Sequence, residues 1–440
     1  MITIQEVRGR QVLDSRGRPT VEVDIISSTG SLGRAIVPSG ASTGKHEAVE
    51  LRDHDSPEYD GLSVRRAVEH VNGEIAAGLL GMDLEDQITI DRRLIELDGT
   101  RNKGRLGANA VLGASMAVAH AASASRGELL YRTLNRLWND RFLTGSAPAI
   151  PTMPMPMVNM ISGGLHAGRN LDIQDILIIP LGANSYSEAL EMIVAMYRGV
   201  AQVLKKYGLE SVLVGDEGGY GPRLRDNEQS LEIVVEAMQK RGFVPGRDIA
   251  IALDIASTHF FDPETERYVL NASGNQEYDR PEFINLLKKW ASQYPIISIE
   301  DGLAEDDWEG WSVLNRSLGG STQLIGDDLF TTQVDRLQKG IELRSANAIL
   351  IKLNQVGTLT ETLEALALAK RHGYCTIVSA RSGETEDSTI ADLAVATDAG
   401  QIKIGSVARS ERLAKYNQLL RIEESLGADC RFAGRTIFSR

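Results

Sequence analysis

Short, almost wholly apolar segments alternate with amphipathic helical segments along most of this 440-residue sequence. Apolar segments of this kind are typical of strands in a parallel sheet that is covered on both faces. The expected strands are 249–253, 296–299, 323–325, 348–351, 376–378 and 401–404. Between them, Thr358 and Glu361 have capping-box spacing and Gly373 follows the last apolar position of a helix. This many strand–helix units favour a closed eight-fold α/β barrel over an open sheet.

The amino-terminal part of the sequence has a different pattern. Residues 2–12, 20–26 and 33–37 alternate apolar and polar side chains and are separated by turn residues, which predicts an antiparallel meander. Helical periodicity follows from about residue 64 to residue 138. Strands followed by helices indicate a small α+β domain.

A proline-rich segment separates the two patterns. Residues 145–156 contain Pro148, Pro151, Pro154 and Pro156. Because proline lacks a backbone donor and has a fixed φ, this segment is predicted to be neither regular helix nor central strand. We therefore expect a smaller α+β domain over residues 1–144 and the barrel over residues 145–440.

The overall charge and the apolar segments exclude some partners. The formal net charge is -13 and the sequence pI is near 5.2, whereas nucleic-acid binding needs a clustered surplus of Lys and Arg. No segment has the apolar length of a signal peptide or a membrane span, so we expect no membrane partner and a cytoplasmic location. The two cysteines, Cys375 and Cys430, lack metal-ligand spacing and suit a reducing compartment.

Ionisable residues stand at or near the carboxyl ends of five expected strands. They are Asp254, Glu300, Asp327, Lys352 and Lys403. In a barrel these strand ends converge on one mouth, where active sites lie. Three carboxylates there suit Mg²⁺, and lysines on the opposite arc, beside a cation, are pushed towards the neutral form that can act as a base. The alternative, a solvated loop residue, is reasonable for one position but not for five in succession.

The strongest motifs lie around these same residues. They are PSGASTGKHE from residue 38, GGLHAG from 163, GDEGG from 215, SIED from 298, GDDL from 326, IKLNQVG from 351, RSGETED from 381 and RSERLAKYNQLLRIEE from 409. With these motifs the sequence resembles the enolase (phosphopyruvate hydratase) family along essentially its whole length. The resemblance implies reversible dehydration of 2-phosphoglycerate to phosphoenolpyruvate through an enolate, with magnesium and a Lys or His base.

The resemblance also implies roles for the metal ligands. Asp254, Glu300 and Asp327 would hold the first Mg²⁺. Ser42, in a mobile Gly/Ser loop, would bind the substrate and a second Mg²⁺ that arrives with it; without the resemblance, Ser42 would be taken for part of a plain flexible turn. Enolases are dimers or octamers, so a homo-oligomer is implied as well.

Catalytic and substrate-binding roles follow in the same way. Lys352 would remove the proton from the carbon next to the substrate carboxylate, and Glu217 would act from the other face as the acid for the departing hydroxyl. Active-site positions of the family also fall on His166 and Asp175. The remaining implied substrate contacts are Gln174 in the same pocket, Lys403 at the carboxylate, and Arg381 and Ser382 at the phosphate, the arginine through a bidentate fork.

Two of these positions depart from the family pattern. Ala380 stands where the family has a histidine before the RSGETED motif, and Asp175 stands where it has a glutamate. A lost hydrogen bond to a charged phosphate costs about 1.5–3 kcal/mol. Moving a catalytic group by roughly 1 Å can cost about 100-fold in rate. Because the base, the acid and the metal ligands are all retained, the two departures suggest that the group bound at the phosphate end has changed.

Two alternatives to an ordinary enolase therefore stay open. One is a specialised paralogue of phosphonate natural-product biosynthesis, similar to carboxyphosphonoenolpyruvate synthase, which would use the same enolate chemistry on a phosphonate carboxylic acid. Space beside Ala380 would then accept a larger group or a second reactant. The other is a non-catalytic structural or binding protein on the same fold, against which the retention of Lys352 and Glu217 argues.

Overall fold

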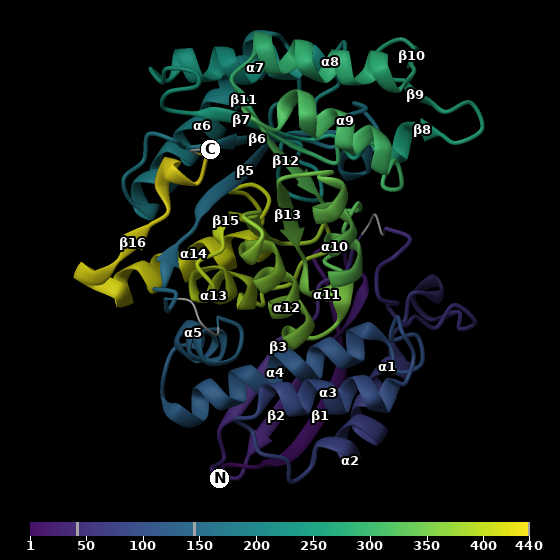
Figure 1. The fold of residues 1–440 in the computed structure, drawn as a ribbon, viewed down its shortest axis with the longest axis vertical. Coiled ribbons are helices and arrows are strands. Elements are labelled where there is room, and N and C mark those ends of the chain that lie inside the picture. Colours follow the sequence, from purple (N-terminus) through teal and green to yellow (C-terminus); the bar gives the residue numbers. More distant parts are fainter. Residues whose placement is uncertain (41–43, 144–146, 439–440) are drawn as a thin grey trace.

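The computed structural model describes residues 1–40, 44–143 and 147–438. Figure 1 shows a smaller amino-terminal part of sheet and helices, purple and blue, stacked below a larger barrel, teal to yellow. Both Ser42 and the expected domain boundary between residues 144 and 145 lie outside the described residues. None of the helices in these ranges combines the length and the apolar character that a membrane span requires.

The amino-terminal part is an antiparallel meander covered by helices. Strands β1 (Ile4–Leu13), β2 (Pro19–Ser27) and β3 (Leu32–Ile36) pair in the order β1-β2-β3, as expected. The helices are α1 (Arg65–His70), α2 (Ala76–Leu79), α3 (Gln87–Asp98), α4 (Ala108–Arg126) and α5 (Leu130–Arg141), with the short turns η1 (Glu58–Gly61) and η2 (Val71–Ile75). Helix α4 packs so closely on β3 that a Cβ at Gly33 would stand 2.1 Å from the backbone N of Ala121, so this position requires glycine.

The described strands of the larger part include eight that close a barrel. Around the barrel they are β11 (Ile296–Glu300), β12 (Gln323–Gly326), β13 (Ala348–Ile351), β14 (Cys375–Ser379), β15 (Gly400–Lys403), β5 (Met155–Ser162), β6 (Asp175–Ile179) and β7 (Ala250–Asp254). Strand β6 runs antiparallel to both β5 and β7, so the expectation of a wholly parallel sheet is wrong at this strand. The connection from β5 to β6 contains only the short turn η3 (Gly164–Ala167), whereas a parallel crossover needs a longer segment, usually a helix.

The proline-rich segment also differs from the expectation. Pro156 lies inside barrel strand β5, although residues 145–156 were predicted to contain no central strand. Pro156 is paired with Ile402 of β15, but the pairing of β5 with β6 begins only at Val158. The proline therefore stands where β5 has a partner strand on one side only, which is where a strand tolerates the missing N–H.

Helices cover the outside of the barrel. They are α6 (Tyr186–Lys206), α7 (Asn227–Lys240), α8 (Arg280–Gln293), α9 (Trp308–Leu318), α10 (Val334–Leu343), α11 (Leu353–Val356), α12 (Leu359–Arg371), α13 (Thr389–Ala396) and α14 (Ser410–Leu426). The short elements are β4 (Thr152–Met153), β8 (Phe261–Asp262), β9 (Arg267–Leu270), β10 (Gln276–Tyr278), β16 (Arg431–Phe432), η4 (Ser257–Phe260), η5 (Gly427–Asp429) and η6 (Gly434–Phe438). The predicted cap of α12 is present, since the Glu361 N–H donates to Thr358 Oγ at 3.1 Å.

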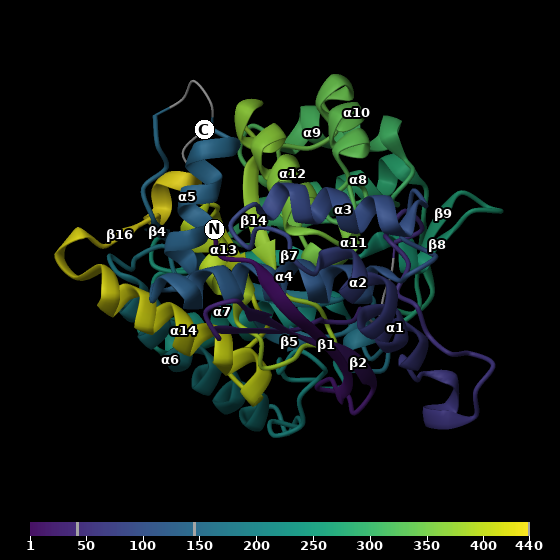
Figure 2. The same ribbon diagram turned by 90° about the horizontal axis from the view of Figure 1, so that it is seen from below.

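The amino-terminal part attaches to the first turn of α12. Asp91 of α3 accepts hydrogen bonds from the backbone N of Thr360 at 2.9 Å and from its hydroxyl at 2.6 Å. Ser115 of α4 accepts from the backbone N of Leu359 at 3.0 Å. Figure 2 shows α3 lying beside α12 in the view from below. Amides that a helix start leaves unpaired are thus satisfied by the neighbouring domain, which holds the two parts together.

Candidate active site

One cavity opens at the carboxyl ends of the barrel strands. It is lined by His166, Gln174, Glu217, Asp254, Lys352, Ser379, Ala380, Arg381, Ser382 and Lys403. All of these except Ser379 are residues that the sequence analysis singled out. Because β6 is antiparallel, it is the amino end of this strand, at Gln174 and Asp175, that lies at the mouth.

Lys403, at the end of β15, joins two of the predicted metal ligands. Its Nζ lies 2.8 Å from Asp254 Oδ2 and 2.8 and 2.7 Å from the two carboxylate oxygens of Glu300. Gln174 Nε2 donates to the same Asp254 oxygen at 3.2 Å. Asp254 and Glu300 are direct partners in the pairing of β7 with β11, so the register brings the two carboxylates together.

Lys352 contacts the third predicted ligand. Its Nζ is hydrogen bonded to Asp327 Oδ2, and Gln355 Nε2 donates to Asp327 Oδ1 at 2.9 Å. Asp301 accepts from the backbone N atoms of Asp327 and Asp328, each at 2.9 Å, which holds the turn after β12. The lysines thus touch the carboxylates directly, whereas the sequence analysis expected them to stand on the opposite arc.

The lysines decide the charge of two of these acids, Asp254 and Asp327. Burial alone would raise the pKa of Asp254 and Asp327, but Lys403 and Lys352 outweigh it and hold each pKa below its usual value. Burial and the neighbouring Asp254 raise the pKa of Glu300 well above its usual value. Burial would lower the pKa of Lys352, but Asp327 outweighs it and raises this pKa. The Asp327 carboxylate therefore favours the protonated form of Lys352 in this arrangement, and the shift towards the neutral form expected beside a cation stays a prediction.

His166 stands between two carboxylates on the other side of the cavity. Its Nδ1 is 2.8 Å from Asp175 Oδ2, and its Nε2 is 3.9 Å from Glu217 Oε1. Burial would lower the pKa of His166, but Asp175 and Glu217 outweigh it and raise the pKa to about 9. Burial would raise the pKa of Glu217, but His166 outweighs it and lowers this pKa. The pair is therefore an imidazolium facing a carboxylate.

Asp175 lies behind His166 and does not line the cavity. Its side chain is fully buried, and its second oxygen accepts from Asn159 Nδ2. Burial raises the pKa of Asp175 to about 6. The Asp175 side chain therefore contacts the imidazole ring of His166 and not the cavity.

Arg381 and Ser382 follow β14 on a further side of the cavity. Arg381 NH1 lies 2.9 Å from Glu47 Oε2 and donates to Asn354 Oδ1 at 2.7 Å. Arg412 donates to the carbonyl oxygens of Arg381 and Ser382, each at 2.6 Å. These contacts fix the backbone of the loop that carries the predicted phosphate ligands.

Ala380 occupies the same wall of the cavity as Arg381 and Ser382. Its backbone N donates to the carbonyl oxygen of Lys403 at 2.8 Å, which continues the pairing of β14 with β15. The side chain is a single methyl group, so this position offers the cavity no hydrogen-bond donor.

The buried acidic groups could hold a metal ion. Asp254 and Glu300 share one ammonium group, and oxygens of Asp301, Asp327 and Asp328 all lie within 4.8 Å of one another. Oxygen donors of this kind suit a hard divalent cation. His166, Asp175 and Glu217 also come within 4.8 Å of one another, but the Nδ1 of this histidine already faces Asp175.

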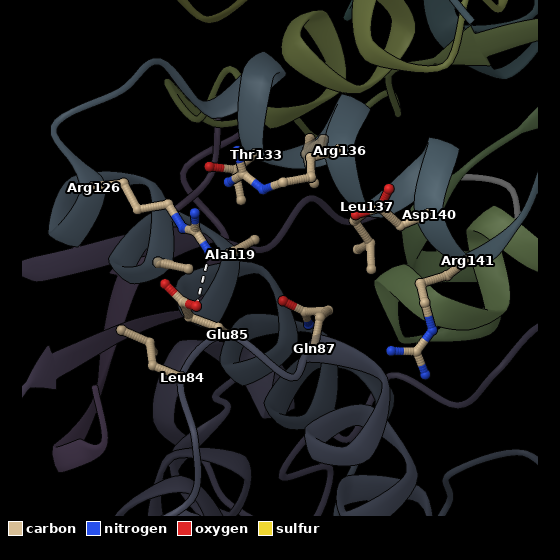
Figure 3. A pocket seen from close by; sticks show the side chains of 12 residues that line it. Leu84, Glu85, Gln87, Ala119, Arg126, Thr133, Arg136, Leu137, Asp140 and Arg141 are labelled. Carbon is tan, nitrogen blue, oxygen red and sulfur yellow. Dashed lines mark ion pairs between the residues drawn. The ribbon is translucent and has the colours of Figure 1, made fainter. Parts of the chain in front are cut away.

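A second cavity, between α4 and α5, lacks such a set of groups (Figure 3). Apolar side chains including Leu84 and Leu137 lie beside the arginines in this cavity. Arg126 forms an ion pair with Glu85 at 2.7 Å, drawn as a dashed line in Figure 3, and Arg136 pairs with Glu128 at 2.5 Å. Two of the arginines of this cavity are thus engaged in ion pairs, and we assign no chemistry to it.

Besides Ser379, several residues that support the site were not singled out from the sequence. Glu47 and Gln355 stand inside the motifs PSGASTGKHE and IKLNQVG, but nothing in either motif indicates which side chain they contact. Asn159 could have been found, because a fully buried amide in an apolar strand needs a specific partner. Ser42 lies outside the described residues.

Comparison with protein families agrees with this geometry. Residues 150–440 match the family described as enolase, C-terminal TIM barrel domain. Residues 4–134 match the family described as enolase, N-terminal domain. The chain therefore belongs to the enolase family of carbon–oxygen lyases, whose activity is the dehydration of 2-phosphoglycerate.

Proposed function

We propose that this protein catalyses the reversible, Mg²⁺-dependent dehydration of 2-phosphoglycerate to phosphoenolpyruvate at the mouth of its barrel. The observation that carries the proposal is that Lys352, Glu217 and His166 line one cavity together with Asp254 and Lys403. A base, an acid and charged groups for a carboxylate are the parts that proton abstraction next to a carboxylate requires.

Asp254, Glu300 and Asp327 are the proposed ligands of the first Mg²⁺. When bound, the ion supplies positive charge next to the substrate carboxylate, where a second negative charge develops. Lys403 adds an ammonium group beside Asp254 and Glu300 for the same carboxylate. A second Mg²⁺ would arrive with the substrate, with Ser42 as its predicted ligand.

Lys352 is the proposed base, and it must lose its proton to act. Asp327 raises its pKa, while Arg381 and Lys403 act in the opposite direction. Asp327 is also a proposed metal ligand. If this carboxylate binds Mg²⁺, Lys352 loses the partner that keeps it protonated. Lys352 then takes the proton from the carbon next to the substrate carboxylate.

Glu217 and His166 form the proposed acid side of the reaction. Glu217 is ionised next to protonated His166, so the imidazolium is the proton reservoir and Glu217 is the group that faces the departing hydroxyl. Asp175 supports this arrangement from behind through its 2.8 Å hydrogen bond to Nδ1. A buried carboxylate in this place stabilises the charged ring and fixes its orientation.

Arg381 and Ser382 are the proposed phosphate ligands, and Gln174 lines the same pocket. A second candidate function is favoured by Ala380, which leaves a methyl group beside these two residues. A phosphonate carboxylic acid, bulkier at this end, would use the same base and metal ligands. A non-catalytic role agrees less well with a buried lysine and carboxylates that remain charged. Burying such charges costs several kcal/mol, and a structural role does not require that cost.

The proposal is tested by incubating the purified protein with Mg²⁺ and 2-phosphoglycerate and measuring the formation of phosphoenolpyruvate. Removal of Mg²⁺ by a chelator should abolish the activity. Lack of turnover with intact Mg²⁺ binding would favour the phosphonate alternative, which is then tested with phosphonate-bearing carboxylic acids. A homo-oligomer and a cytoplasmic location stay predictions, and sedimentation of the purified protein checks the first.

A further inference from the structure

One carboxylate of the amino-terminal part reaches Arg381 without lining the cavity. Glu47 lies in an irregular segment, and only 6% of its side chain is exposed. Its Oε2 accepts from Arg381 NH1 at 2.9 Å and its Oε1 accepts from Arg381 NH2 at 3.2 Å. The two residues are 334 positions apart, so only the fold creates this buried two-point ion pair.

The same carboxylate is held by two further groups. The backbone N of Gly44 donates to Glu47 Oε1 at 3.0 Å, and Gln355 Nε2 donates to it at 3.3 Å. Gln355 Nε2 also donates to Asp327 Oδ1 at 2.9 Å, and Gln355 Oε1 accepts from Thr332 at 2.7 Å. Glu47 therefore contacts the Arg381 guanidinium, on the phosphate side, directly. It is linked to Asp327, on the metal side, through the buried amide of Gln355.

Arg381 has other carboxylates close by. Asp327 and Asp328 both act electrostatically on its guanidinium. A buried guanidinium without a carboxylate is costly, and an arginine side chain has enough rotatable bonds to follow the strongest remaining acceptor. Without Glu47, the charged groups that still attract this guanidinium include Asp327, a proposed metal ligand, and its neighbour Asp328.

We propose that Glu47 is a positioning residue that holds the Arg381 guanidinium on the phosphate side of the cavity and away from Asp327 and Asp328. Asn354 assists by accepting from Arg381 NH1 at 2.7 Å, so hydrogen bonds to Glu47 and Asn354 together orient the plane of the guanidinium. The inference rests on the proposed function, in which Arg381 binds the substrate phosphate. Glu47 itself touches no reacting atom.

A positioning role and simple electrostatics predict opposite effects of neutralising Glu47 on phosphate binding. Two unit charges about 6 Å apart repel by roughly 3 kcal/mol at an effective dielectric constant of about 20. If Glu47 were only a like charge next to the phosphate, its removal would tighten phosphate binding. If it positions Arg381, its removal weakens binding despite this gain. The direction of the change therefore separates the two roles.

The test is titration of the Mg²⁺-loaded protein with inorganic phosphate, followed by ³¹P NMR. Glu47→Gln should bind phosphate at least about fivefold more weakly than the wild type, the size of a typical coupling between contacting residues. Glu47→Asp keeps the charge and should lose less. Where 2-phosphoglycerate is turned over, KM should rise by a larger factor than kcat falls.

Glu50→Gln is the matched control. Glu50 lies three positions further on, pairs with Arg52 at 2.6 Å and accepts from Ser39 at 2.9 Å. It forms the same kind of ion pair in the same segment, but with Arg52 and not with Arg381. Glu50→Gln should leave phosphate affinity unchanged, and thermal unfolding of both variants shows whether any loss of affinity follows from a loss of stability.

Unchanged or tighter phosphate binding by Glu47→Gln would overturn the inference. Arg381→Met separates this failure from a failure of the proposed function. If Arg381→Met binds phosphate as the wild type does, Arg381 is not a phosphate ligand and both ideas fall. If Arg381→Met loses phosphate binding while Glu47→Gln keeps it, only the role of Glu47 is wrong.

Discussion

Two of the regions that bury carboxylates surround them with different partners. At the barrel mouth, Asp254 and Asp327 face the ammonium groups of lysines. Where the amino-terminal helices meet the barrel, Asp91 accepts hydrogen bonds from neutral groups such as those of Gln87 and Thr360. Asp392 of α13 likewise accepts from neutral donors, among them the backbone N of Tyr131 and the amide of Gln418.

The partners decide the protonation of these acids. Lysines outweigh burial at the mouth and keep the pKa of Asp254 and Asp327 low. Neutral donors do not outweigh burial at the other sites, so burial raises the pKa of Asp91 to about 6 and that of Asp392 to about 7. Asp254 and Asp327, balanced by ammonium groups, stay charged and can exchange one cation for another. Carboxylates balanced by amides and hydroxyls serve as connections between helices.

The largest effect is expected from Lys352→Met. Loss of a positioned base should lower kcat by about 100-fold to 10,000-fold. Lys370→Met is the control, since Lys370 is also a substantially buried lysine, hydrogen bonded to Asp398 outside the cavity. Steady-state turnover of 2-phosphoglycerate measures both. Equal losses in the two variants would mean that the lysine at the mouth is structural.

Glu300→Gln should mainly affect the metal. With one of three carboxylates neutralised, Mg²⁺ affinity should fall by at least about 100-fold, measured by calorimetry. Asp392→Asn removes a buried carboxylate from the other region and should leave Mg²⁺ affinity unchanged. Normal Mg²⁺ binding by Glu300→Gln would contradict the assignment of this ligand.

Asp175→Asn should shift the pH dependence of turnover. Asp175 helps raise the pKa of His166 to about 9, so the wild-type activity should fall only as pH rises through about 9. The amide removes this contribution, so the variant should lose activity at a lower pH and turn over roughly 100-fold more slowly. A basic limb at the same pH in both proteins would show that His166 is not the proton reservoir.

Ala380→His probes the altered wall of the cavity. If the protein uses 2-phosphoglycerate, an added donor to the phosphate should raise kcat/KM by about tenfold. If the natural substrate is bulkier at this end, the imidazole occupies its place and activity with that substrate falls. Comparison of kcat/KM for the two substrate classes in both proteins gives the answer.

Asp91→Asn should have the smallest effect on activity and a clear effect on stability. The folded-state pKa of Asp91, about 6, is above its usual 3.8, so ionisation opposes folding. This penalty is absent below about pH 4 and reaches about 3 kcal/mol above about pH 7. Wild-type stability should fall across this range more steeply than that of the variant, as urea unfolding measures. Parallel curves would place the pKa of Asp91 near its ordinary value.

Much of the fold followed from local patterns in the sequence. The strand–helix alternation, the meander and the cap at Thr358 depend on neighbours within a few residues, so periodicity and capping rules suffice to predict them. Convergence of the strand ends follows from barrel geometry, and Asp254, Lys352 and Lys403 line one cavity.

The direction of β6, the strand position of Pro156 and the partner of each charged group were decided only by the tertiary structure. A lysine beside a carboxylate and a lysine beside a cation look alike in the sequence, yet the first stays protonated and the second does not. Likewise, nothing local connects Glu47 with Arg381 or places Asp175 behind His166. Ion pairs and pKa values depend on distances across hundreds of residues and on exclusion of water, and both arise only when the chain is folded.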